Sequence, residues 1–130
     1  MPVTGANGIA FAPPPDGRLW VLSYSQPGAV TRFKVDATHA EVAGTRDSFK
    51  LPGNNADGIT FDKSGNAYIT AGGLYRVTPD GMATRLNASG GANVEFGAGA
   101  LSCKLILWAG SPVHTMMNDA EGAIVPWHHL

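Results

Sequence analysis

Apolar and polar residues alternate in short stretches along most of this chain, and turn residues separate the stretches. Residues 18–24 are rich in aromatic and β-prone side chains and follow an Asp-Gly turn, and residues 29–35 alternate with period two after a Pro-Gly pair. The helical period of 3.6 residues is nearly absent. The pattern predicts antiparallel β-strands joined by tight turns.

The same order of elements occurs three times. A small polar residue precedes an apolar alternation at Asn7, Asp57 and Asn93, and strands bounded by glycine follow each time. Residues 59–86 show this most clearly, because they contain four short strand patterns in about thirty residues, the length of one blade of a β-propeller. Tandem β-propeller blades are therefore the expected architecture.

We expect an all-β protein with about three four-stranded antiparallel blades, which is half of a six-bladed propeller, in a single domain over residues 1–130. The expected blades cover about residues 5–52, 53–90 and 91–130. The first blade is the longest, and we assign its extra length to a loop over residues 36–55.

The third unit is the least regular of the three. Its strand patterns lie at residues 92–96, 104–108, 113–117 and 122–127. Large side chains recur at matching places in all three units. We expect the phenylalanines of the first strands to be core residues: Phe11, Phe61 and Phe96. We expect the aromatic residues of the second strands to pack between blades: Trp20, Tyr68 and Trp108.

Three blades form an open arc. Each blade of a propeller buries its faces against its neighbours, so an arc leaves one apolar flank at each end. Two arcs related by a two-fold axis would close into a six-bladed ring. The sequence therefore predicts a homodimer, because an unclosed arc exposes a large apolar patch.

Composition narrows the range of partners and compartments. The 130 residues carry a formal net charge of -1 and nine Lys and Arg in total, so neither nucleic acid nor a membrane is an expected partner. No stretch approaches the roughly 20 apolar residues that span a bilayer, and the first residues lack the pattern of a signal peptide. Cys103 is the single cysteine, so no disulfide framework is possible. We expect a cytoplasmic protein.

Asn7 and Asp57 are the strongest candidates for chemistry. The residue at the head of the first strand of a blade lies near the propeller axis, and amide and carboxylate oxygens suit a hard divalent cation. Asn93 occupies the matching position in the third unit, and Glu95 lies on the same side of its strand. Both are further candidates for the central channel. The alternative explanation is that Asn-Gly and Asp-Gly are turn formers and that Glu95 is a rim carboxylate.

These landmarks resemble the SMP-30/gluconolactonase/luciferin-regenerating-enzyme family. Residues 6–11 followed by 16–21 resemble its metal-asparagine blade, residues 55–62 followed by 65–69 resemble its catalytic-aspartate blade, and residues 91–97 resemble its following segment. The resemblance implies that Asn7 is a metal ligand and that Asp57 is a metal ligand and the general base. It also implies a divalent metal, with calcium expected first and zinc, manganese or magnesium as alternatives, and a lactone or ester substrate.

The chain departs from that family in its extent. It resembles only the C-terminal half, and it contains no Glu-Gly-Pro of the kind that supplies the metal-binding glutamate of the N-terminal half. A natural half-propeller, a fragment and an inactive relic all fit this departure. Phosphotriesterase-type and streptogramin-lyase-like propellers share the same blade pattern. Two functions follow: a metal-dependent lactone or ester hydrolase, or a non-catalytic binding or assembly module.

Overall fold

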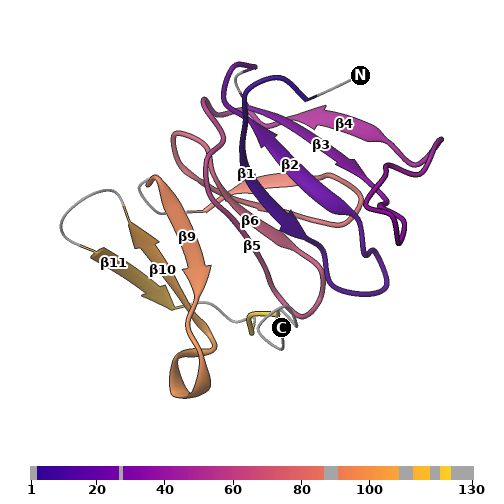
Figure 1. Cartoon of the computed structure of the whole chain (residues 1–130). Helices are drawn as coiled ribbons and strands as arrows, with labels where there is room; N and C mark the ends of the chain where they lie inside the picture. The colour runs from indigo at the N-terminus through magenta and orange to yellow at the C-terminus, as the bar shows by residue number, and fades with distance from the viewer. Residues whose placement is uncertain (1–2, 27, 87–90, 109–112, 118–120, 124–130) are drawn as a thin grey trace.

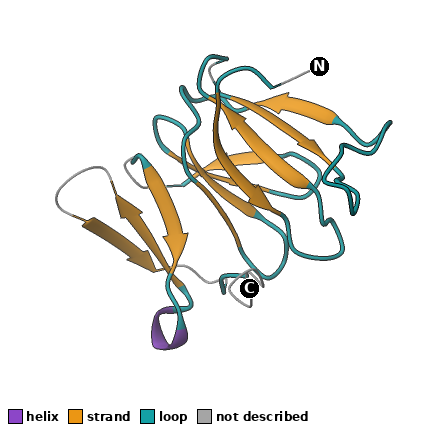
Figure 2. Ribbon diagram, viewed as in Figure 1, coloured by secondary structure: helices purple, strands orange, loops and turns teal. Residues whose placement is uncertain are grey.

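The computed structural model describes residues 3–26, 28–86, 91–108, 113–117 and 121–123, with residues 113–117 described by their backbone alone. These residues form three antiparallel β-sheets that follow one another in chain order (Figure 1). Strands account for nearly all the regular structure, beside one 3-10 turn, η1 (Gly99–Leu101) (Figure 2). The expectation of an all-β chain of propeller blades is confirmed.

Strands pair in sequence order within each sheet, as consecutive hairpins do. The first sheet contains β1 (Ala6–Phe11), β2 (Leu19–Ser23), β3 (Ala29–Phe33) and β4 (Asp47–Lys50). The second contains β5 (Ile59–Phe61), β6 (Ala67–Thr70), β7 (Leu74–Val77) and β8 (Ala83–Arg85). The described part of the third contains β9 (Asn93–Phe96), β10 (Lys104–Trp108) and β11 (Val113–Met117).

A carboxylate holds the turn between the first two strands of the second sheet. Asp62 is fully buried and accepts hydrogen bonds from the backbone N–H groups of Ser64 and Asn66, from the Asn66 side chain, and from the Tyr68 hydroxyl at 3.1 Å. Gly65 completes the turn with φ +86°, a conformation that favours glycine. The turn and the ring of Tyr68 are therefore fixed together.

In the first sheet, too, a turn carboxylate binds a buried aromatic side chain. Asp16 accepts hydrogen bonds from Trp20 Nε1 at 3.0 Å and from Arg18 Nε at 2.5 Å. In both sheets a turn carboxylate thus accepts a hydrogen bond from the polar end of a buried aromatic side chain.

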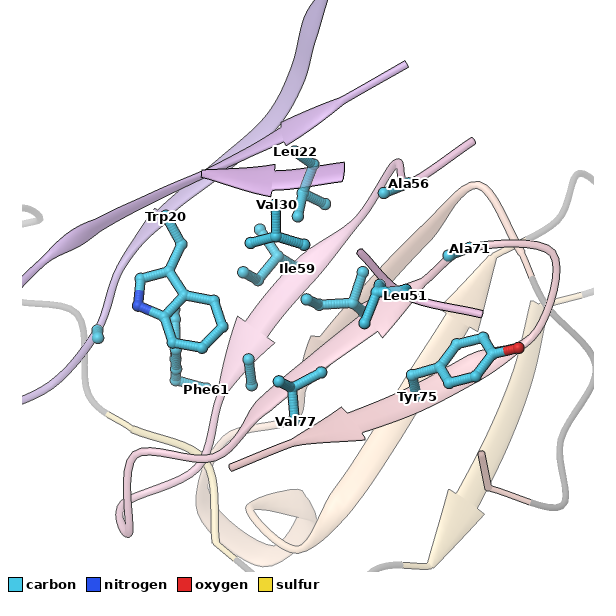
Figure 3. Close-up of a cluster of buried hydrophobic side chains, with 13 residues drawn as sticks. Trp20, Leu22, Val30, Leu51, Ala56, Ile59, Phe61, Ala71, Tyr75 and Val77 are labelled. Atoms are coloured by element: carbon cyan, nitrogen blue, oxygen red, sulfur yellow. The ribbon is translucent and has the colours of Figure 1, made fainter. Parts of the chain in front are cut away.

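Two apolar clusters join the three sheets. Trp20, Leu22 and Val30 of the first sheet pack against Ile59 and Phe61 of the second (Figure 3). Tyr68 and Leu74 on the opposite face of the second sheet pack against a group from the third: Val94, Phe96, Leu105 and Leu107. The second sheet is therefore covered on both faces, as an internal blade of a propeller is.

The segment expected as a loop over residues 36–55 contains the strand β4, so that expectation is wrong in this part. Asp47 and Phe49 explain the difference. Asp47 pairs with Arg32 of β3 at 2.6 Å, and the Phe49 ring lies edge-on to Trp20, with ring centroids 5.8 Å apart. These contacts are between residues distant in sequence, so local patterning did not reveal them.

The expected last strand of the third unit, residues 122–127, lies mostly outside the described residues. Its described part does not pair with β11. Gly122 forms a bridge with Asp62, and the N–H of Ala123 donates to the carbonyl oxygen of Phe61 at 2.8 Å. This segment therefore returns to the second sheet, next to β5.

Candidate functional site at the inner strands

The first strands of the three sheets lie next to one another, and they bring the predicted site residues to one region. Asn7 is in β1, Asp57 precedes β5 by two residues, and Asn93 begins β9. The strands β1 and β5 are in contact, as are β5 and β9. This is the arrangement that strands nearest to a propeller axis would have.

The glycine that follows each of the first two site residues allows these strands to approach. A Cβ added to Gly8 would lie 1.9 Å from the carbonyl oxygen of Asp57. A Cβ added to Gly58 would lie 2.7 Å from Cα of Asn93. In each pair, therefore, the Asn or Asp provides the polar side chain, and the glycine leaves the space that the site residue of the next blade occupies.

Asn7 and Asp57 are in direct contact. Asn7 Nδ2 donates a hydrogen bond of 2.8 Å to Asp57 Oδ1. Asn7 is exposed and Asp57 is half-buried, so solvent can reach the pair. No hydrogen bond from another described residue reaches Asn7 Oδ1 or Asp57 Oδ2, so two oxygens are free to accept a ligand.

The backbone of Asp57 is anchored by a buried threonine of β6. The N–H of Asp57 donates to the carbonyl oxygen of Thr70 at 2.9 Å, and the N–H of Gly58 donates to Thr70 Oγ1 at 2.8 Å. Thr70 is fully buried. Sequence reasoning did not identify this residue, because its role depends on pairing between β6 and the segment before β5.

Asn93 and Glu95 lie on the third inner strand but do not join the Asn7–Asp57 pair. Asn93 Oδ1 accepts a hydrogen bond from the N–H of Val94 at 3.0 Å. Glu95 Oε1 accepts hydrogen bonds from Thr60 Oγ1 at 2.6 Å and from the N–H of Phe96 at 3.1 Å. Thr60, in the middle of β5, was not foreseen as a partner of this carboxylate.

None of the described residues whose pKa is shifted belongs to this site. Burial opposes ionisation of Asp47, but hydrogen bonds and charge from Arg32, and then from Arg18, outweigh it and hold the pKa of Asp47 below its ordinary value. This ion pair lies near the outer edge of the first sheet. Arg32 also donates to the carbonyl oxygen of Pro79, which ties the first sheet to the second.

Asn7 and Asp57 fit a hard cation by donor type, since both present oxygens. Two side-chain oxygens are fewer than the six to eight that Ca²⁺ commonly takes. Within the described ranges, no group of three or more His, Cys, Asp or Glu gathers as a metal site. Further oxygens would have to come from water, from substrate or from another chain.

Blade order, packing on both faces of the second sheet, and polar residues on adjacent inner strands define a segment of a β-propeller. Comparison of the structure with solved structures agrees. The chain is similar to a structural-genomics protein provisionally assigned as a gluconolactonase, with TM-score 0.68 and 23% identity over 92% of this chain and 41% of that one.

A second similar structure is a catalytically inactive virginiamycin B lyase from Staphylococcus aureus, determined with quinupristin. The TM-score is 0.63 and the identity 16%, over 97% of this chain and 44% of that one. The chain thus spans less than half the length of these two proteins. No protein-family model matches the chain, and no curated protein matches it in sequence.

These likenesses confirm, at the level of the fold, the resemblance to gluconolactonase-type propellers that the sequence motifs carry. They do not assign roles to Asn7 or Asp57. The part of the chain that the structure describes contains no helix of the length and apolarity needed to cross a bilayer.

Proposed function

We propose that the inner strands form part of a divalent-cation-dependent hydrolase site for lactones or esters, in which Asn7 and Asp57 are metal ligands and Asp57 is the general base. The 2.8 Å contact between the two side chains carries this proposal. It places an amide and a carboxylate from two blades together at a solvent-accessible position. The likeness to a protein provisionally assigned as a gluconolactonase supports the choice of substrate class.

Calcium is the first metal to test, because both ligands offer oxygen and neither offers nitrogen or sulfur that zinc would prefer. Zinc, manganese and magnesium are the alternatives. A bound cation would polarise the substrate carbonyl and lower the pKa of a bound water.

The chain's own residues would orient and deprotonate the nucleophile. Thr70 fixes the backbone of Asp57, and the amide of Asn7 donates to its carboxylate, so the two contacts hold the Asp57 side chain in place to deprotonate a water. As the water oxygen bonds to the carbonyl carbon, Asp57 takes the proton. The ester C–O bond then breaks, and the proton passes to the leaving oxygen, which gives a carboxylic acid and an alcohol.

A non-catalytic binding or assembly module is the second candidate. One observation favours it: the Asn7–Asp57 pair alone supplies too few oxygens for a complete cation shell. We also propose a cytoplasmic location, for which the free Cys103 is the supporting observation.

Cation binding and catalysis can be tested separately. Calcium, zinc, manganese and magnesium are added in turn while the thermal midpoint is measured, since a ligand of the folded state must raise it. Sugar and aliphatic lactones are then assayed with the wild type, Asp57→Ala and the control Asp80→Ala, which removes an exposed turn carboxylate. Equal hydrolysis by all three proteins would exclude Asp57 as the base. No cation response would exclude the metal site.

A further inference from the structure

An apolar residue, one intervening residue and a phenylalanine occur in the first strand of every sheet. The three pairs are Ile9 and Phe11, Ile59 and Phe61, and Val94 and Phe96. Because side chains alternate along a strand, both members of a pair point to the same face of their sheet. In the second and third sheets, this face packs on the preceding sheet.

Burial separates the first pair from the other two. Ile59 and Phe61 are 8% and 4% exposed, and Val94 and Phe96 are 2% and 8% exposed. Ile9 and Phe11 are 61% and 60% exposed. Phe11 was expected in the core, and that expectation is wrong for the single chain, because no described sheet covers this face. The sequence repeat therefore marks a packing surface that no sheet covers among the described residues.

The two internal interfaces show what kind of surface covers such a pair. Trp20 of the first sheet meets Phe61 of the second edge-on, with ring centroids 5.2 Å apart at 85°. Tyr68 of the second sheet meets Phe96 of the third in the same way, at 5.2 Å and 89°. The partner of each phenylalanine is thus a large side chain in the second strand of the preceding sheet.

The third sheet offers a surface of this kind. Trp20 is the cross-strand partner of Ala10, which lies between Ile9 and Phe11, and Tyr68 is likewise paired with Thr60. The corresponding residue in the third sheet is Ile106, paired with Glu95. Trp108 lies two residues further on the same face of β10 and is 51% exposed. This face carries large apolar side chains without a covering sheet among the described residues.

We infer that the face of the first sheet bearing Ile9 and Phe11 packs against the face of the third sheet bearing Ile106 and Trp108 in a second copy of this chain. Ile106 takes the place that Trp20 and Tyr68 have inside the chain and contacts Phe11 of the partner. Trp108 takes the place of Leu22, two residues beyond Trp20, and contacts Ile9 of the partner.

A two-fold axis repeats this contact. The first sheet of each copy packs on the third sheet of the other copy. Two identical interfaces therefore close one ring. Each similar propeller is a little more than twice as long as the region matched by this chain, so two copies approach the length of one ring.

Ring closure would also complete the candidate site. The inner strands of both copies would surround one axis, so Asn7, Asp57 and Asn93 would each be present twice. Oxygens beyond those that the described residues of one chain supply to a hard cation would then come from the second copy. The dimer itself rests on the packing of the sheets and not on the proposed hydrolysis.

Sedimentation equilibrium without added metal or substrate tests the inference. The wild type should have the mass of two chains. Phe11→Lys and Ile106→Glu should each shift the mass to one chain, because each buries an unpaired charge in both interfaces. Met82→Lys is the matched control, since Met82 is exposed outside both faces, and its mass should stay that of two chains. A well-folded wild type with the mass of one chain would overturn the inference.

Mixing the two variants distinguishes this arrangement from pairing between identical faces. A mixed dimer has one unaltered interface and one in which lysine meets glutamate, so an equal mixture of Phe11→Lys and Ile106→Glu should regain the mass of two chains. If either variant alone remains a dimer, or if the mixture stays monomeric, the proposed pairing of unlike faces is wrong.

Two further measurements keep the test independent of folding and of activity. Circular dichroism identifies a variant that has simply unfolded. The fluorescence emission of Trp108 should move to shorter wavelength as the wild-type concentration rises. That shift should be lost in Trp108→Phe. Absence of that shift in the wild type would contradict burial of Trp108. A dimer without lactone hydrolysis would remove the proposed function and keep this inference.

Discussion

Gly8 packs its α-carbon against the main-chain carbonyl of Asp57, so closely that a Cβ at Gly8 would lie 1.9 Å from that oxygen. The contact joins the first blade to the second at the candidate site. It explains why a glycine, rather than another turn-forming residue, follows Asn7. The same relationship recurs between Gly58 and Asn93, where the added Cβ would lie 2.7 Å from Cα.

Gly8→Ala should lower the free energy of unfolding by about 1–3 kcal/mol, because the backbone must move to accept the methyl group. It should also weaken any cation response by displacing Asp57. Chemical denaturation and metal-dependent thermal melts measure the two effects. Gly17→Ala is the control. The φ of +63° at Gly17 predicts a loss of about 1–2 kcal/mol in the free energy of unfolding. Its added Cβ meets no atom within 4 Å, so the cation response should remain. Equal loss of the cation response in both variants would contradict the steric explanation.

Asp62→Ala should be strongly destabilising, by about 3 kcal/mol or more. It removes the side-chain acceptor of the Ser64 and Asn66 N–H groups, and it removes the Asp62 contact of the fully buried Tyr68 hydroxyl. Urea denaturation compares it with Asp80→Ala, which removes an exposed carboxylate and should cost less than about 1 kcal/mol. Similar midpoints for the two variants would show that the Asp62 network contributes little.

Acid should destabilise the protein in part through Asp47. Arg32 and Arg18 hold the pKa of Asp47 below the 3.8 of the free side chain, so the unfolded state binds a proton first as the pH falls. The stabilisation is complete above the unfolded pKa and is lost as the pH falls through the folded pKa, below about pH 4. Asp47→Asn should therefore flatten the acid limb of a plot of thermal midpoint against pH. An acid limb as steep in Asp47→Asn as in the wild type would exclude the Arg32 pair as the cause.

Asn7→Ala and Asp57→Ala should be coupled in cation binding. If both side chains hold one cation, removing either should abolish most of the rise in thermal midpoint, and removing both should add little more. Asn7→Asp is the matched variant, because it keeps an oxygen at the position and adds negative charge, so it should keep or strengthen the response. Independent, additive losses would place the two residues in separate sites.

Thr60→Val should release Glu95 from β5 and leave its carboxylate with the N–H of Phe96 as its described donor. We expect a loss of stability of about 1–2 kcal/mol, since a hydrogen bond to a charged group is removed at nearly constant side-chain volume. Urea denaturation of Thr60→Val, Glu95→Gln and the double variant measures the coupling. Additive effects would show that the 2.6 Å contact contributes nothing of its own.

The sequence predicted the fold class well because the relevant signals are local. Alternation with period two, glycine at the turns, and the recurring order of short strands each involve residues close together in the chain. These signals identified β1, β2, β5 and β6 and placed Asn7 and Asp57 at equivalent points of two units. They did not identify β4, because its place depends on Arg32 and Trp20.

The site was predictable in its members but not in its contacts. A repeat shows that Asn7, Asp57 and Asn93 are equivalent, yet equivalence does not say which of them touch. The hydrogen bond joins Asn7 to Asp57, whereas Asn93 is bound to its own following residue and Glu95 to Thr60. The support of Asp57 by Thr70 likewise depends on pairing between neighbouring segments of the second sheet.

The sequence by itself determined that this protein is built of repeated β units, each headed by a polar residue and carrying an apolar face. Tertiary structure alone decided that Phe61 and Phe96 are buried while Phe11 and Trp108 are exposed. The physical reason is that a strand's alternation says which side chains share a face, but only the presence or absence of a neighbouring sheet decides whether that face meets protein or water.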